Sequence, residues 1–314
     1  MTRARIDALW LRAKQWYGIQ IYRFIRRTFH FWERLGLHLT MNHHYEPVPD
    51  TRKLNEALWT TQSQLAGVVV NEEAQLTLLA TFTAAFKHEY DALPREKPSI
   101  PHGFYLGNPA FPSVDAEMLW CMVRYFKPRR VIEIGCGHSS YLSAQALLMN
   151  ARDDSSRVGE LVCIEPTPNA VLKAGFPGFT ELITKRVEQV PLSLFDTLDG
   201  NDILFIDSSH MLKIGSDVQY EYLEILPRLR KGVLIHVHDI HFPMEYPRNL
   251  VLGKRRFWNE QYLLQAFLSF NDSFRMLLAG NLLHVRHPDA LAAAFASYDR
   301  NGRWPGSCWL QRTR

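Results

Sequence analysis

Short apolar runs alternate with helical segments from residue 114 onward. Continuous stretches of Val, Ile and Leu are expected as strands, and the segments between them space their apolar residues three or four apart, as helices do. This alternation is typical of a parallel sheet that helices cover on both faces, and we predict a doubly wound α/β fold. The expected strands are 130–135, 161–166, 180–184, 202–207, 232–239, 274–278 and 307–311, and the expected helices are 115–126, 139–150, one near 170, 215–229 and 259–270.

Residues 5–38 carry a different pattern, in which large apolar residues recur every three or four positions with Arg and Lys between them. This pattern predicts a long amphipathic helix, with Gly18 as a candidate break. Such a helix could lie on an anionic membrane surface, or its apolar face could pack on the predicted α/β domain or on a second subunit of a homo-oligomer. The apolar positions are Ile6, Leu9, Trp10, Ala13, Trp16, Tyr17, Ile21, Phe24, Ile25, Phe31, Trp32 and Leu35.

Prolines at 94, 98, 101, 109 and 112 separate this N-terminal part from the alternating region. Because proline interrupts helices and central strands, the segment 93–112 is expected to be irregular, whereas residues 72–91 before it are predicted to be helical. We therefore expect an N-terminal helical extension or lid over residues 1–92 and a catalytic domain over residues 93–314.

The net charge of +4 is distributed unevenly, because residues 1–38 hold eight Arg or Lys against Asp7 and Glu33. The remainder of the chain is slightly acidic, whereas a nucleic-acid enzyme would usually carry basic residues across its catalytic domain, so no nucleic-acid partner is expected. The four cysteines form no Cys-x-x-Cys pair, and no apolar run suits a signal peptide or a membrane span. We expect a cytoplasmic protein, with residues 1–38 as a candidate contact to the inner face of the membrane.

The strongest chemical signal is the run VIEIGCGHSS at residues 131–140, an apolar strand that ends in a glycine turn and leads into a helix. Glycines at 135 and 137 permit a tight turn and a close approach of the backbone to a ligand. The next strand ends at Glu165, whose carboxylate can accept hydrogen bonds from both ribose hydroxyls of an adenosine. A ligand that contains adenosine is therefore expected at this sheet edge.

Dinucleotides and S-adenosylmethionine both contain adenosine, but two features favour the second. Ser140 stands where the dinucleotide fingerprint has its third glycine. Glu133, two residues before the first glycine, suits the cationic amino-acid part of S-adenosylmethionine and would repel a pyrophosphate. An edge carboxylate with local backbone partners is the alternative interpretation of Glu133.

The runs EIGCGHSS, CIEP, LFIDSSH and VHDI resemble the class I S-adenosylmethionine-dependent methyltransferases, specifically the methyltransferase 24 subgroup. The resemblance covers about residues 104–311 and implies a seven-stranded sheet with the order 3-2-1-4-5-7-6 and an antiparallel last strand. It also implies that an extension forms a lid that brings Tyr105, Asn108 and Asp115 near the cofactor. The implied cofactor residues are Glu133, Gly135, Gly137, Ser139 and Glu165, with Val187 and Glu188 near the adenine and Asp207 facing the sulfonium.

Histidines and aspartates follow two neighbouring strands of the predicted sheet. Asp207 and His210 follow the strand at 202–207, and His238, Asp239 and His241 end the strand at 232–239. The carboxyl ends of parallel strands share one sheet edge, where α/β proteins bind their ligands. Methyl transfer to oxygen requires removal of the hydroxyl proton, so His238 and His210, and after them His241, are candidate bases. Histidines that only form structural hydrogen bonds are the plainer interpretation.

A divalent metal is the rival explanation for these residues. By resemblance, catechol-type and macrolide-sugar O-methyltransferases hold Mg²⁺ through an Asp after strand four and an Asp-Asp or Asp-Asn pair after strand five. Asp207 and Asp239 match two of these ligands, but His238 stands beside Asp239 where a carboxylate or amide is expected. That departure favours a softer divalent ion over Mg²⁺.

These residues and the resemblance predict a methyltransferase that uses S-adenosylmethionine. The resemblance alone implies that the acceptor is a hydroxyl of a sugar, a glycan or a small secondary metabolite. Two other classes stay open from the sequence. One is a non-catalytic scaffold that binds the cofactor and docks to a membrane or partner through residues 1–38. The other is a dinucleotide oxidoreductase.

Overall fold

The computed structural model describes residues 3–314, with side chains from residue 16 onward, and the chain divides into two compact units between Leu58 and Trp59. This division falls earlier in the chain than the boundary expected between residues 92 and 93. Residues 59–92 lie in the larger unit because helix α2 (Glu72–Tyr90) packs on helix α3 (Asp115–Phe126). The buried Arg124 guanidinium ties the two helices together, since it donates to both carboxylate oxygens of Glu89 at 2.7 and 2.8 Å.

The smaller unit, residues 1–58, contains helix α1 (Arg3–Arg34) and the short 3₁₀ turn η1 (Thr51–Lys53), and a second turn, η2 (Glu56–Trp59), lies at the division. Helix α1 runs through Gly18 without the expected break. A mid-helix glycine costs about 1 kcal/mol relative to alanine, which is small for a helix of 32 residues. The predicted side-chain pattern at residues 5–15 lies outside the described side chains. Among the residues that the structure describes, no helix is long and apolar enough to cross a membrane.

The larger unit contains one seven-stranded sheet, in the order β3-β2-β1-β4-β5-β7-β6. Strands β1 to β5 are parallel, and β7 pairs antiparallel with both β5 and β6. The predicted doubly wound fold and strand order are therefore confirmed. The strands are β1 (Arg130–Ile134), β2 (Glu160–Ile164), β3 (Glu181–Ile183), β4 (Ile203–Ile206), β5 (Leu234–Val237), β6 (Phe274–Ala279) and β7 (Cys308–Arg312).

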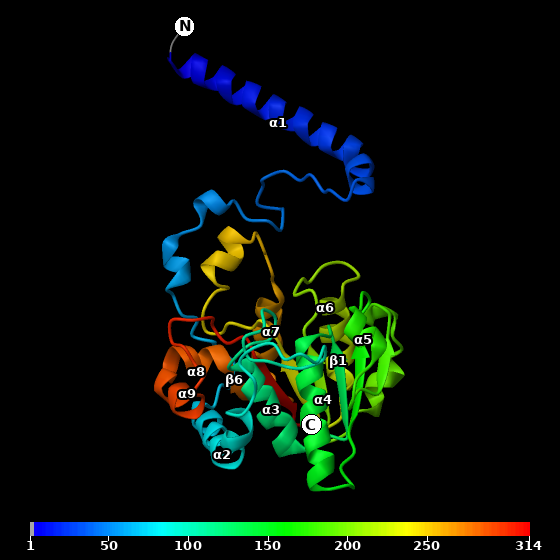
Figure 1. Cartoon of the computed structure of the whole chain (residues 1–314). Helices are drawn as coiled ribbons and strands as arrows, with labels where there is room; N and C mark the ends of the chain where they lie inside the picture. The colour runs from blue at the N-terminus through cyan, green and yellow to red at the C-terminus, as the bar shows by residue number, and fades with distance from the viewer. Residues whose placement is uncertain (1–2) are drawn as a thin grey trace. The chain divides into compact units, whose positions relative to one another are not determined.

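Helices cover both faces of this sheet (Figure 1). Alternate residues of each strand point to opposite faces, so Val131 and Phe205 pack with α2, α3 and α4 (His138–Asp153), whereas Ile132 and Leu204 pack with the helices on the other face. The first face also receives α9 (Pro288–Ala294), and the second receives α6 (Asp217–Tyr220) and α7 (Glu260–Leu268). Both faces are thus buried, as the continuous apolar strands require. The remaining helices are α5 (Ala170–Ala174) and α8 (Gly280–Arg286).

The helix predicted at 215–229 differs in form from a regular α-helix. It consists of α6, a π-helical turn at Glu221–Ile225 and a 3₁₀ turn at Leu226–Arg228 that contains Pro227. The π turn aims the Glu221 carboxyl into the protein, where it is fully buried and accepts a hydrogen bond from Ser208 at 3.0 Å. π turns of this kind often occur beside functional sites, and Ser208 lies in the loop that follows β4.

Candidate functional site

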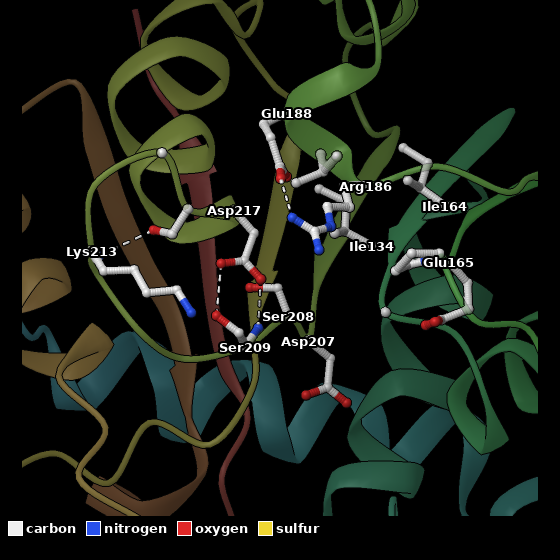
Figure 2. Close-up of a pocket in the computed structure, with 15 residues that line it drawn as sticks. Ile134, Ile164, Glu165, Arg186, Glu188, Asp207, Ser208, Ser209, Lys213 and Asp217 are labelled. Carbon is white, nitrogen blue, oxygen red and sulfur yellow. Dashed lines mark hydrogen bonds and ion pairs between the residues drawn. The ribbon is translucent and has the colours of Figure 1, made fainter. Parts of the chain in front are cut away.

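A cavity of about 370 Å³ opens where β1, β2 and β4 end, at the carboxyl edge of the sheet. Figure 2 shows Glu165, Asp207 and Glu188 around this cavity, on three different segments of the chain. Five of the predicted cofactor residues line it: Gly135, Glu165, Val187, Glu188 and Asp207. The other lining residues are Ile134, Ile164, Pro166, Arg186, Ser208, Ser209, Lys213, Gly215, Ser216 and Asp217.

Gly135 is required by a contact within the protein. Its φ of +80° lies in the left-handed region, and a Cβ built there would be 1.8 Å from the carbonyl oxygen of Asp207. A side chain at 135 would therefore push the end of β1 away from the end of β4. At Gly137, by contrast, nothing lies within 4 Å of such a Cβ, so there is open space before α4 begins.

Glu165, at the end of β2, is held by its neighbours while it lines the cavity. Oε1 accepts from the Thr167 backbone and hydroxyl at 2.8 and 3.0 Å, and Oε2 accepts from the Cys136 backbone at 3.3 Å. Each carboxylate oxygen has about two acceptor positions, so Oε2 can still accept a hydrogen bond from a ligand. This arrangement suits the ribose contact that the sequence predicts.

Glu133 does not line the cavity, and neither do Gly137 and Ser139. The Glu133 side chain is fully buried below the turn, where one oxygen accepts from the Ser139 and Ser140 hydroxyls at 2.5 and 2.9 Å. Its other oxygen has no hydrogen-bond partner in the part of the chain that the structure describes. Burial raises the pKa of Glu133 to about 8 despite the two serines, so the carboxyl is mostly neutral at pH 7 in this structure.

The loop after β4 contributes residues that the sequence analysis missed. Lys213, Ser216 and Asp217 line the cavity, and Asp217 accepts a 2.7 Å hydrogen bond from the Ser209 hydroxyl (Figure 2). The sequence analysis placed a helix at 215–229, which includes Ser216 and Asp217, and assigned no role to Lys213 before it. The position of this loop directly after a strand of the parallel sheet was the signal for a binding loop. Arg186, also missed, lines the cavity and lies 4.0 Å from Glu188, its neighbour on the same turn.

Asp207, His238 and Asp239 gather at the ends of β4 and β5. One donor atom from each lies within 4.8 Å of the others, which is close enough for all three to bind one metal ion. His238 is buried, with Nδ1 at 3.4 Å from Asp207 Oδ1 and 3.8 Å from Asp239 Oδ1. Neither ring nitrogen makes a well-aligned hydrogen bond with any described residue. Two carboxylates and an unsatisfied imidazole are a donor set that fits a divalent ion.

His210 approaches the same two carboxylates from the loop after β4. Its Nε2 lies 3.4 Å from Asp207 and 3.6 Å from Asp239, while its Nδ1 is 2.9 Å from the buried Glu260 carboxylate at the start of α7. Burial alone would lower the pKa of His210, but Asp207 and Glu260 outweigh it and raise the pKa to about 10. Asp207 and Asp239 likewise raise the pKa of His238 against burial.

His241 has the opposite electrostatics. Burial lowers the pKa of His241 to about 4, so the ring is neutral at physiological pH. Its Nδ1 lies 3.1 Å from the Asp239 carbonyl oxygen, which can only accept, so Nδ1 carries the proton. That leaves Nε2 as a hydrogen-bond acceptor and a potential proton acceptor.

The segment expected to form a lid has mainly structural contacts. The Asn108 side chain is buried and closes a turn by hydrogen bonds to Tyr105, Ala110 and Phe111. Asp115, at the start of α3, accepts from the Gly306 and Ser307 backbones and lies 3.6 Å from His238 Nε2. Asp115 therefore supports the far side of the His238 ring.

A family model matches the part of the chain that contains most of this site. Residues 132–240 match the family model Methyltransf_24, described as a methyltransferase domain. An "Uncharacterized protein" of Archaeoglobus fulgidus is 29% identical over 171 residues, covering 51% of this chain and 74% of that protein. Two solved structures are more distant, both at 13% identity and a TM-score of 0.36. The first is the CmcI-N160 apo-structure, and the match covers 65% of this chain and 72% of that chain. The second is the MycE methyltransferase in complex with Mg, SAH and mycinamycin VI, and the match covers 67% of this chain and 52% of that chain.

Together, the family match, the strand order and the cavity at the glycine turn define a class I methyltransferase domain. The chain therefore contains a methyltransferase domain at residues 132–240, and S-adenosylmethionine is the cofactor that this domain uses. This match is to a methyltransferase domain, so it does not support the alternative of a dinucleotide oxidoreductase.

Glu165 provides a direct test of the cofactor contact. Glu165→Ala is expected to weaken S-adenosylhomocysteine binding by about 10- to 100-fold, because a hydrogen bond to a charged group contributes about 1.5–3 kcal/mol. Isothermal titration calorimetry measures the affinity. Glu181→Ala is the matched control and should leave binding unchanged. Glu181 is the first residue of β3, at the end of that strand away from the carboxyl edge of the sheet. Equal affinities in the two variants would refute a role for Glu165 in the site.

Glu133 should make the stability of the ligand-free protein depend on pH. Its pKa is higher in the folded protein than its ordinary value of 4.5, so the folded state binds this proton more tightly. The resulting stabilisation is complete below about pH 4.5 and is lost as pH rises toward 8. Wild type should therefore lose stability relative to Glu133→Gln between pH 5 and pH 9 in chemical denaturation. Parallel profiles for the two proteins would contradict the raised pKa.

Proposed function

We propose that this enzyme transfers the methyl group of S-adenosylmethionine to a hydroxyl oxygen of a small molecule, such as a sugar or secondary metabolite. One observation carries the proposal: Asp207 lines the cofactor cavity and also belongs to the cluster with His238 and Asp239. A hydroxyl bound at that cluster would lie next to the methyl donor. Positioning of this kind accounts for much of the rate of a transfer between two bound molecules.

The same cluster supports a divalent metal as a second component. Asp207, His238 and Asp239 would hold the ion, and Asp115 would support the outer nitrogen of His238. Carboxylates behind metal-bound histidines are common and fix the orientation of the ring. The imidazole favours an ion such as Mn²⁺, Fe²⁺ or Zn²⁺ over Mg²⁺, which prefers oxygen ligands alone. A bound divalent ion would supply Lewis acidity that promotes loss of the hydroxyl proton.

The proton acceptor depends on which histidine is neutral. Without a metal, the carboxylates around His238 and His210 raise their pKa values, so both rings hold their protons near pH 7 and are poor bases. His241 is neutral and has Nε2 as its acceptor. Because His241 is neutral, we rank it ahead of His210 and His238 as the base, a change from the order that the sequence suggests, although a pKa of about 4 makes it a weaker base than an ordinary histidine. A general base contributes typically about 10²–10⁴-fold to a rate.

Detection of the product tests the function itself. Small-molecule extracts are incubated with purified enzyme and S-adenosylmethionine that carries a trideuterated methyl group, and the labelled products are identified by mass spectrometry. We expect a labelled metabolite whose methyl group is attached to oxygen. An Asp207→Asn enzyme is the control for background methylation. If wild type binds S-adenosylhomocysteine but labels nothing in any extract, the non-catalytic scaffold becomes the better interpretation.

Metal binding is measured without the methyl acceptor. Chelator-treated wild type is expected to bind one Mn²⁺ per chain in electron paramagnetic resonance titrations, and His238→Ala or Asp239→Asn should bind it at least about tenfold more weakly. Asp289→Asn, whose side chain is 96% exposed, is the control for loss of a surface carboxylate. Unchanged Mn²⁺ affinity in both cluster variants would remove the metal from the proposal.

A further inference from the structure

Helix α1 presents two chemically different sides. Ile21, Ile25 and Trp32 lie four and seven residues apart on one side, which we call the apolar arc. Each is followed two positions later by an arginine, and two residues of an α-helix correspond to a rotation of about 200°. Arg23, Arg27 and Arg34 therefore form a row on the opposite side, the basic arc, and all three are exposed.

Aromatic side chains widen the apolar arc. Tyr17, Phe24 and Phe31 are spaced by seven residues along one edge of it and are 63%, 57% and 58% exposed. Exposed aromatics in such number are unusual on a helix that faces only water. The Trp32 ring has its polar edge satisfied, since Nε1 donates to Thr28 at 3.1 Å. The arc thus combines apolar bodies with aromatic rings, as helices at a membrane interface do.

The positive charge of residues 1–38 favours an anionic partner. Residues 1–38 carry eight Arg or Lys and only two acidic residues. One of these, Glu33, already interacts with His30 and His38 at 3.3 and 3.6 Å. Pairing α1 with α1 of a second copy would bring two strongly positive helices together. An anionic surface would neutralise the charge and accept the apolar arc at the same time.

We propose that α1 binds in the headgroup region of an anionic lipid bilayer, with the apolar arc toward the acyl chains and the basic arc toward the phosphates. The helix lies in the plane of the interface, over the length of about 48 Å that 32 residues give. This attachment is independent of the methyl-transfer proposal. It would hold the enzyme at a membrane surface, where lipid-embedded or membrane-associated acceptors are concentrated.

The test uses the full chain and vesicles of defined composition. Co-sedimentation is measured with phosphatidylcholine vesicles and with vesicles that contain phosphatidylglycerol, at low and high salt. We expect binding to the anionic vesicles that weakens at high salt, because salt screens exposed charges over about 8 Å at physiological ionic strength. The triple variant Arg23→Gln, Arg27→Gln, Arg34→Gln should bind about a hundredfold more weakly, since each basic residue near such a surface contributes about 1 kcal/mol. Glutamine retains the helix propensity of arginine, so the helix itself should be preserved.

A second variant separates the apolar contribution. Ile21→Ser with Ile25→Ser should reduce binding at both salt concentrations, whereas Phe270→Ser, at a 91% exposed site in the larger unit, is the matched control and should not. Equal binding of wild type to neutral and anionic vesicles, or none to either, would overturn the proposal. So would a dimer in analytical ultracentrifugation that the serine variant dissociates while vesicles fail to bind, because α1 would then pair with a second copy.

Discussion

The contact between Gly135 and the Asp207 carbonyl is the constraint on which the site depends. Strands β1 and β4 are neighbours, and their ends approach so closely that residue 135 cannot carry a side chain. This approach brings Asp207 to the edge of the cavity and, through the parallel pairing of β4 with β5, beside His238 and Asp239. A single backbone contact thus determines how the cavity and the cluster of Asp207, His238 and Asp239 lie relative to each other.

The site also brings several carboxylates close together, and their negative charge has to be balanced. Asp115, Asp207, Asp239 and Glu260 lie around the imidazoles of His210 and His238, and the Arg303 guanidinium approaches Asp239 at 3.8 Å. Burying so much negative charge is costly unless protons or a cation accompany it. The two histidines lower the pKa of Asp207 although burial acts in the opposite direction. Protons and a metal ion would therefore compete for the same group of carboxylates.

Much of the fold could be predicted because its signals are local. The helix at 115–126 was predicted with the observed limits, and all seven strands lie within a few residues of their predicted positions. These elements could be predicted because apolar runs and glycine turns depend on the conformation of neighbouring residues. The strand order came from the family resemblance. Helices α8 and α9 were missed, because their short sequences around His287 and Pro288 carry little periodicity.

The site was less predictable because its decisive contacts are distant in sequence. Spacing could show that Asp207 and His238 share a sheet edge, but not that Asp115 and Glu260 lie behind the two histidines. Those carboxylates determine which rings are charged, and so they reorder the candidate bases. Glu133 illustrates the same limit: its position in the turn was evident, whereas its burial against Ser139 and Ser140 depends on how α4 packs.

Strand β7 has a consequence for how the enzyme is made. It lies between β5 and β6, and the residues that lead into it bind Asp115, with Gly306 so close to Asp239 that a Cβ there would be 3.0 Å from the Asp239 Cα. A ribosome synthesises β7 after the other six strands, so one edge of β5 stays unpaired until then. The hydrogen bonds from Gly306 and Ser307 that hold Asp115 beside His238 can form only after these residues have left the exit tunnel.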